Sequence, residues 1–161
     1  MPFDGFLKID GIKGECKDSK HKDEIDVLSF SYGVTQSTSV ATGGGLTAGK
    51  STLGAFSFNQ TYHKGSVPLF VYCATGKHVD SITFTARKSA GDAQLEYLVI
   101  KFEHCLVTSV QTMGGSENEI PGETVEIQYS KVSFLYKEQD AKGGVASETP
   151  GGYDQKTNKK V

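Results

Sequence analysis

Ser81-Ile-Thr-Phe-Thr-Ala-Arg-Lys88 begins the stretch of sequence that decides the fold, and this stretch continues to residue 136. Within it, Ile82, Phe84 and Ala86 alternate with polar residues. A period of two with β-branched and aromatic side chains is typical of a half-buried β-strand. The stretch therefore opens with a strand that places one face in the core.

Two further strands are expected in the same stretch. After a turn predicted at residues 89–92, large apolar residues of one parity recur between residues 95 and 110. This is long for a single strand, since most have about 3–10 residues, and it predicts a bend or a bulge near His104. In the third strand the apolar parity changes, which predicts a β-bulge at Ser130–Lys131. Long, bent antiparallel strands predict a closed or nearly closed β-barrel.

Length and composition agree with one β-rich domain. The chain has 161 residues, enough for a substantial core, and its 19 glycines favour many turns over long helices. We predict one β-barrel domain at residues 1–137 and a flexible tail at residues 138–161, where apolar residues are sparse. The formal net charge of -2 provides no basic field for nucleic acid or acidic membranes.

The remaining elements follow from periodicity and end signals. Strands are expected at residues 5–12, 25–34 and 55–62. A single short α-helix is expected at residues 66–75, with Ser66 as its cap and Gly76 at its end. Residues 35–54 are rich in Ser, Thr and Gly and predict an extended loop. Loops of this length in a compact domain are uncommon and are usually functional or mobile.

The strand expected at residues 25–34 has two unequal faces. One face carries large side chains and is expected to enter the core: Leu28, Phe30, Tyr32 and Val34. The other face, beyond Val27, is small and weakly polar: Ser29, Ser31 and Gly33. Because the small face contributes little to a core, it is solvated, lines a cavity or lets another surface approach closely.

One motif matches a nucleotide-binding pattern. Gly44-Gly-Leu-Thr-Ala-Gly-Lys-Ser51 satisfies GxxxxGK[ST]. That chemistry requires a strand before the motif and a helix after it, so that backbone amides converge on phosphates. Here the preceding strand ends near Val34, and the residues after Ser51 alternate like another strand. We therefore interpret the motif as a loop of small residues without a nucleotide.

No other catalytic or metal-binding pattern is found in the sequence. Its histidines and cysteines lack the HExxH and CxxC spacings of metal sites. His104 precedes Cys105, but neighbouring strand residues point to opposite faces and cannot form a nucleophile and its base. The odd number of cysteines predicts reduced thiols, with Cys73 and Cys105 in the core. We predict no enzyme activity, no cofactor and no metal.

Several short runs, in order along essentially the whole chain, form a specific pattern: Phe6-Leu-Lys-Ile-Asp-Gly-Ile-Lys-Gly-Glu15, Asp18-Ser-Lys-His-Lys22, Ile25-Asp-Val-Leu-Ser-Phe-Ser-Tyr-Gly33, Ala74-Thr-Gly-Lys-His78, Gln94-Leu-Glu-Tyr-Leu98, Glu119-Ile-Pro121, Glu123-Thr-Val125, Ser130-Lys131, Gly152-Tyr-Asp154 and Asn158-Lys-Lys160. This pattern resembles the hemolysin-coregulated protein family, which forms the inner tube of the bacterial type VI secretion system. The resemblance implies an antiparallel β-barrel of two sheets with one helix. It also implies hexameric rings that stack into a tube.

The resemblance further implies partners and a location. A contracting sheath would expel the tube, together with a spike, and some family members hold effector proteins in the ring lumen. We expect a homohexamer that is cytoplasmic before firing and then secreted without a cleaved signal peptide. Asp4, Lys8 and Asp10 stand where a signal peptide would need an apolar core. Neither nucleic acid nor membrane insertion is expected.

The two unusual surfaces acquire expected roles from the resemblance. The small face is expected to line the lumen through Ser29, Ser31 and Gly33. The long loop is expected to join one ring to the next, with these candidate contact residues: Val40, Gly43, Gly44, Gly45, Leu46 and Lys50. The alternative is a small monomeric β-barrel that binds a ligand, which a measured mass in solution would distinguish from a ring.

Overall fold

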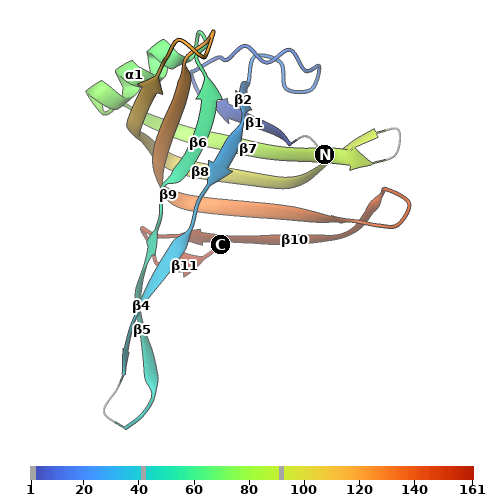
Figure 1. The fold of residues 1–161 in the computed structure, drawn as a ribbon. Helices are drawn as coiled ribbons and strands as arrows, with labels where there is room; N and C mark the ends of the chain where they lie inside the picture. Colours follow the sequence, from blue (N-terminus) through green and yellow to red (C-terminus); the bar gives the residue numbers. More distant parts are fainter. Residues whose placement is uncertain (1–2, 41–42, 91–92) are drawn as a thin grey trace.

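The computed structural model describes residues 3–40, 43–90 and 93–161, which form antiparallel strands and one helix (Figure 1). The elements in chain order are β1 (Asp4–Ile9), β2 (Ile25–Val27), β3 (Ser29–Ser31), β4 (Val34–Val40), β5 (Leu46–Leu53), β6 (Phe56–Thr61), α1 (Ser66–Thr75), β7 (His78–Ala90), β8 (Ala93–Met113), β9 (Gly122–Gln139), β10 (Val145–Asp154) and β11 (Lys159–Lys160). The predicted class, mainly β with a short helix, is confirmed. Residues 91 and 92 of the predicted turn lie outside the described residues.

Strand pairing builds one large sheet and one hairpin. The large sheet has the order β11-β10-β9-β8-β7-β1-β2, and β6 joins it by pairing with β9 and with β3. β4 and β5 form a separate two-stranded sheet. Of the two predicted forms, the closed barrel is not found: the ladder runs β2-β1-β7-β8-β9-β6-β3, and β2 pairs with β1 whereas β3 pairs with β6. Leu28 connects β2 to β3, and its backbone N–H donates a hydrogen bond to the carbonyl of Asn59 in β6 at 2.8 Å.

β7, β8 and β9 bend together along one line across the large sheet. In each strand the buried parity changes, from Val79 to Ile82, from Phe102 to Cys105, and from Tyr129 to Val132. The three changes face one another, since Glu103 pairs with Ser81 on one side and with Lys131 on the other. We call this the fold line. Figure 1 shows β9 turning sharply along its length.

The fold line tests two sequence predictions. His104 has a φ of 56°, so the bend predicted near this residue is confirmed. The parity change predicted at Ser130–Lys131 is also confirmed, but a bulge there is wrong. The pairing of β9 with β8 keeps its register at this point and shifts between Val107 and Ser109 instead. Both strands bend together, so neither needs an extra residue relative to the other.

The core lies inside the bend and is dominated by aromatic rings. Phe56, Phe58, Phe84 and Phe102 are fully buried. The Phe56 ring centroid lies 4.8 Å from that of Phe102 and 5.4 Å from that of Phe84, in tilted arrangements. Such aromatic pairs contribute about 0.5–1.5 kcal/mol beyond the burial of their area. Leu69 attaches the helix to this core, since it too is fully buried.

The core face predicted for residues 25–34 is wrong in part. Ile25 is buried in β2, whereas Leu28 and Val34 are 60% and 63% exposed. Phe30 packs against the core, and the Tyr32 ring lies 6.2 Å from it. The chain changes its pairing partner at Leu28, and this interrupts the alternation that a single strand would have kept.

The helix predicted at residues 66–75 is confirmed, with a different cap. Gly65 is the N-cap and makes no side-chain hydrogen bond, while the Ser66 hydroxyl accepts a hydrogen bond from the backbone N–H of His63 at 3.0 Å. Gly76 ends the helix with a φ of 67°. The Lys77 N–H then donates to the carbonyl of Tyr72 at 3.1 Å, as in a Schellman-type end.

Two segments predicted as irregular are strands. The segment predicted as a loop contains residues 35–40 of β4 and all of β5, which pair as a hairpin. β10, predicted as part of a flexible tail, pairs with β9 from Gln139 to Lys131. Both segments are short of apolar residues, which concealed them from a search for hydrophobic alternation. β10 needs no core of its own, because the edge of β9 that β6 leaves uncovered supplies its backbone partners.

Candidate assembly surfaces

The β4–β5 hairpin projects from the rest of the chain (Figure 1). Every residue of β4 is exposed, and Val40 and Leu46 face each other near its tip with 75% and 76% of their surface exposed. Gly43, Gly44 and Gly45 lie in the connection between the two strands. An isolated two-stranded sheet is only marginally stable in water. Within the part of the chain that the structure describes, the apolar pair at its tip has no contact with the core of its own chain.

The nucleotide-binding pattern falls on this hairpin. The motif runs from Gly44 into β5, and the carbonyl of Lys50 accepts a hydrogen bond from the Ser37 hydroxyl at 3.4 Å. The next element is strand β6, where a P-loop would have a helix. The predicted loop is therefore wrong for residues 46–51, which lie in β5, and the motif lacks the following helix that a P-loop uses to bind phosphate.

The small face predicted on residues 29–33 is accessible to solvent. Ser29, Ser31 and Gly33 are all exposed, and a Cβ built on Gly33 would meet no atom within 4 Å. The Ser29 hydroxyl accepts a hydrogen bond from the Asn59 amide at 2.6 Å. Among the described strands β3 pairs with β6 alone, so its second edge is open. Open edges offer backbone donors and acceptors to a neighbouring strand.

An apolar hollow lies where the hairpin joins the body, and we call it the aromatic pocket. It has a volume of about 380 Å³. Its wall includes Tyr32, Tyr129, Phe134 and Tyr153, with Val34 and Leu53 at the base of the hairpin. Burial raises the pKa of Tyr129 to about 12. No sequence pattern predicts this pocket, because its wall combines side chains from strands that are distant along the chain.

A buried histidine fixes the loop that follows β1. His21 is 6% exposed and stacks on Phe6 with ring centroids 4.1 Å apart. Its Nδ1 lies 3.0 Å from a carboxylate oxygen of Glu24, and its Nε2 lies 2.7 Å from one of Glu96 in β8. The loop is therefore tied to the sheet at its middle. Sequence analysis did not single out His21, because a loop histidine among charges has no distinctive pattern.

Arg87 provides a second tie to the same loop. Its guanidinium donates to Asp18 at 2.7 Å and to Asp4 at 3.5 Å, and it lies 4.7 Å from the Phe6 ring centroid. The hydrogen bond from Arg87 lowers the pKa of Asp18 to about 2. These contacts hold β1, β7 and the loop together. They are structural, since they occupy the charged groups with one another.

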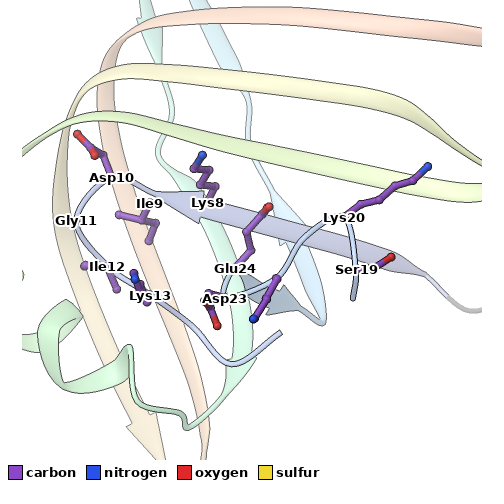
Figure 2. A pocket seen from close by; sticks show the side chains of 11 residues that line it. Lys8, Ile9, Asp10, Gly11, Ile12, Lys13, Ser19, Lys20, Asp23 and Glu24 are labelled. Carbon is purple, nitrogen blue, oxygen red and sulfur yellow. The ribbon is translucent and has the colours of Figure 1, made fainter. Parts of the chain in front are cut away.

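The outer side of this loop forms a charged hollow. Figure 2 shows lysine and carboxylate side chains from β1 and the following loop around a volume of about 540 Å³. Lys8 and Lys20 alternate with Asp10 and Asp23, so the hollow has no field of one sign. Such a mixture is typical of a solvated surface and gives no specific ligand chemistry.

The remaining candidate chemical groups are dispersed. Within the described residues no three His, Cys, Asp or Glu side chains gather as metal ligands, and no helix is long and apolar enough to cross a membrane. Cys105 is buried and His104 is exposed, so they lie on opposite faces as predicted. Burial raises the pKa of the Cys16 thiol to about 11 and that of Cys105 to about 12. Cys73 is partly buried against the core.

These features define a class: a mainly antiparallel β-protein with one short helix and a projecting hairpin whose apolar tip is exposed. Residues 6–136 match the family described as type VI secretion system effector, Hcp. Protein hcp1 of Pseudomonas aeruginosa is 40% identical over 143 residues, which cover 89% of this chain and 88% of that relative. The chain therefore belongs to the Hcp family.

Solved structures agree with this assignment. Hcp1 from Salmonella typhimurium has a TM-score of 0.82 and 37% identity, with 100% of both chains covered. A structure described as a type six secretion system protein has a TM-score of 0.92 and 30% identity, with 99% of both chains covered. The family predicted from the short sequence runs is confirmed, and with it a bacterial type VI secretion protein.

Proposed function

We propose that the chain is the tube subunit of a type VI secretion system. In this proposal subunits form hexameric rings, the rings stack into a tube, and sheath contraction expels the tube together with the spike. The observation that carries the proposal is the β4–β5 hairpin, which extends an exposed apolar pair beyond the body of an Hcp-family chain. A hairpin without a core of its own is best explained by a neighbour.

Open strand edges support ring formation. β3 pairs with β6 alone among the described strands, so its second edge is left for a neighbouring copy. A cyclic arrangement covers such edges and leaves no free end. Ser29, Ser31 and Gly33 would then line the lumen, where small side chains leave room for an effector protein. The chain would be cytoplasmic until the tube is fired and secreted afterwards.

Two measurements test this proposal: the mass of the assembly in solution and its appearance in electron micrographs. Sedimentation at micromolar concentration should give the mass of six subunits, and electron microscopy should show rings and stacks. Replacing residues 40–50 by a short Gly-Ser link should leave the rings intact and abolish stacks and secretion. Rings of the shortened protein that still stack would remove the hairpin from the mechanism.

A monomeric ligand-binding protein is the second candidate. The aromatic pocket favours it, since a hollow of about 380 Å³ with aromatic walls is within the size range of small-molecule sites. A monomeric mass at micromolar concentration, together with binding of an aromatic probe such as anilinonaphthalene sulfonate, would favour this candidate over the tube subunit.

A further inference from the structure

Two apolar features lie at opposite ends of the hairpin. Val40 and Leu46 form the exposed pair at the tip, and the aromatic pocket lies at the base beside Val34. β4 runs from Val34 to Val40, so the two features are separated by about 20 Å at ~3.4 Å per residue. Because its own strand is extended, the tip of one chain cannot reach the pocket of the same chain.

We propose that the aromatic pocket receives the Val40–Leu46 tip of a hairpin from a second copy in the next ring. This rests on the proposed tube function and names the receiving surface that the tip would contact. The pocket and the tip form a heterologous pair, in which one patch of each copy contacts a different patch of the next. Such contacts repeat without closing, which is the geometry of a stack.

The chemistry of the two surfaces matches. The residues that line the aromatic pocket carry no charge, and Tyr129 and Val132 are buried at 4% and 3% exposure. Tyr32 and Val34 stand more open at 41% and 63%. The tip pair is neutral and apolar as well. Burial of such side chains stabilises an interface in proportion to the apolar area removed from water, and no charge is left without a partner.

The area of one contact is too small to hold two subunits together. A stable pairwise interface buries about 1,200–2,000 Å² in total, and a tip formed by two side chains covers only a small part of that. Six tips that engage at once, on one rigid ring, would act together through their high effective concentration. The inference therefore predicts that rings stack and that single subunits do not associate through the tip.

A charge exchange between the two surfaces tests the contact. Val34→Asp and Val40→Lys change exposed residues, so both variants should fold and form rings. Each should raise the ring concentration needed for stacking by about tenfold or more, because a charge enters an apolar contact. The double variant Val34→Asp/Val40→Lys should recover stacking at low salt and lose it again at high salt, since a new ion pair is screened. Sedimentation and electron microscopy measure ring and stack separately.

A matched control and the contrary outcomes complete the experiment. Phe70→Asp alters an apolar side chain of the helix that is 63% exposed, as Val34 is, and should leave stacking unchanged. A wild-type protein that forms no rings would overturn the proposed function itself. Rings that stack normally with Val34→Asp, or a double variant no better than the single ones, would overturn the pocket as the receiver. If Val34→Asp rings stacked normally but no longer retained an effector protein, the pocket would bind the effector, and the inference would also be overturned.

Discussion

The sheet at the fold line and the β4–β5 hairpin are both antiparallel strands, but they are stabilised in different ways. In β7, β8 and β9, large side chains are buried both before and after the fold line, where the buried parity changes. In the hairpin, β4 buries nothing, and its two strands are joined by backbone pairing and hydroxyl contacts. The first region therefore carries the fold, and the second is the region that we propose contacts another chain.

The largest expected effect contrasts the two regions directly. Phe56→Ala should lower the free energy of unfolding by about 3–5 kcal/mol, because it removes a fully buried ring and leaves a cavity. Leu46→Ala at the hairpin tip should change it by less than about 0.5 kcal/mol. Urea denaturation of both variants measures this. Equal losses would show that the tip is part of the fold, and the comparison would fail.

A smaller effect is expected at the fold line itself. His104 holds a left-handed backbone with a φ of 56°. His104→Val should lower the free energy of unfolding by about 1–3 kcal/mol, because a β-branched side chain is strained in that region. His104→Gly should keep or slightly raise stability, since glycine adopts positive φ freely. If valine were tolerated as well as glycine, the left-handed backbone would not be what turns the sheet.

The stability contributed by His63, which precedes helix α1, should depend on pH, whereas that of the hairpin should not. His63 accepts a hydrogen bond from the Gly65 N–H at Nδ1 and contacts Gln60 through Nε2, at 2.9 Å each. Burial lowers the pKa of His63 below its ordinary 6.5. The unfolded chain therefore takes up the proton more readily, and stability should fall as the pH drops below about 6.5.

Denaturant midpoints at pH 8 and pH 5.5 measure this dependence of stability on pH. His63→Asn should reduce the difference between the two midpoints. A change at the hairpin, such as Ser37→Ala, should leave that difference as it is in the wild type, because the hairpin has no histidine. A wild-type protein that is more stable at pH 5.5 than at pH 8 through His63 would reverse the sign and contradict the burial of this side chain.

Sequence reasoning succeeded where burial controls the pattern. The alternation of Ile82, Phe84 and Ala86 identified β7, and the unusual length of the next apolar run indicated the bend at His104. The family was evident from short runs of residues. The same reasoning failed for the hairpin and for β10, which have few apolar residues, because backbone pairing alone leaves no hydrophobic period.

The candidate surfaces were predicted unevenly for related reasons. Val40 and Leu46 stood out as the larger apolar side chains in a polar segment, and the structure places them together at the tip. The aromatic pocket could not be predicted, since Tyr32, Phe134 and Tyr153 meet only after distant strands are assembled. Exposure of the small face on β3 is seen in one chain, whereas its place in a lumen depends on neighbours and stays a prediction.

The smallest expected effect lies within the hairpin and tests whether it opens independently of the core. The Thr47 hydroxyl lies 3.0 Å from the Ser39 carbonyl and donates to it, and the Ser39 and Thr47 hydroxyls are 2.9 Å apart. Cross-strand pairs of this kind contribute about 0.2–1 kcal/mol. The double variant Ser39→Ala/Thr47→Val removes this energy from the closed hairpin and so lowers the free energy of opening it. Amide hydrogen exchange in β4 and β5 should therefore speed up by about twofold to fivefold. Exchange in β8 should stay unchanged, because those amides open only with the core.

Hydrogen exchange on unstacked rings is the measurement, since a stacked neighbour would protect the hairpin. Equal acceleration in both regions would mean that the hairpin and the core unfold as one unit, and the separation of fold from contact surface would be lost.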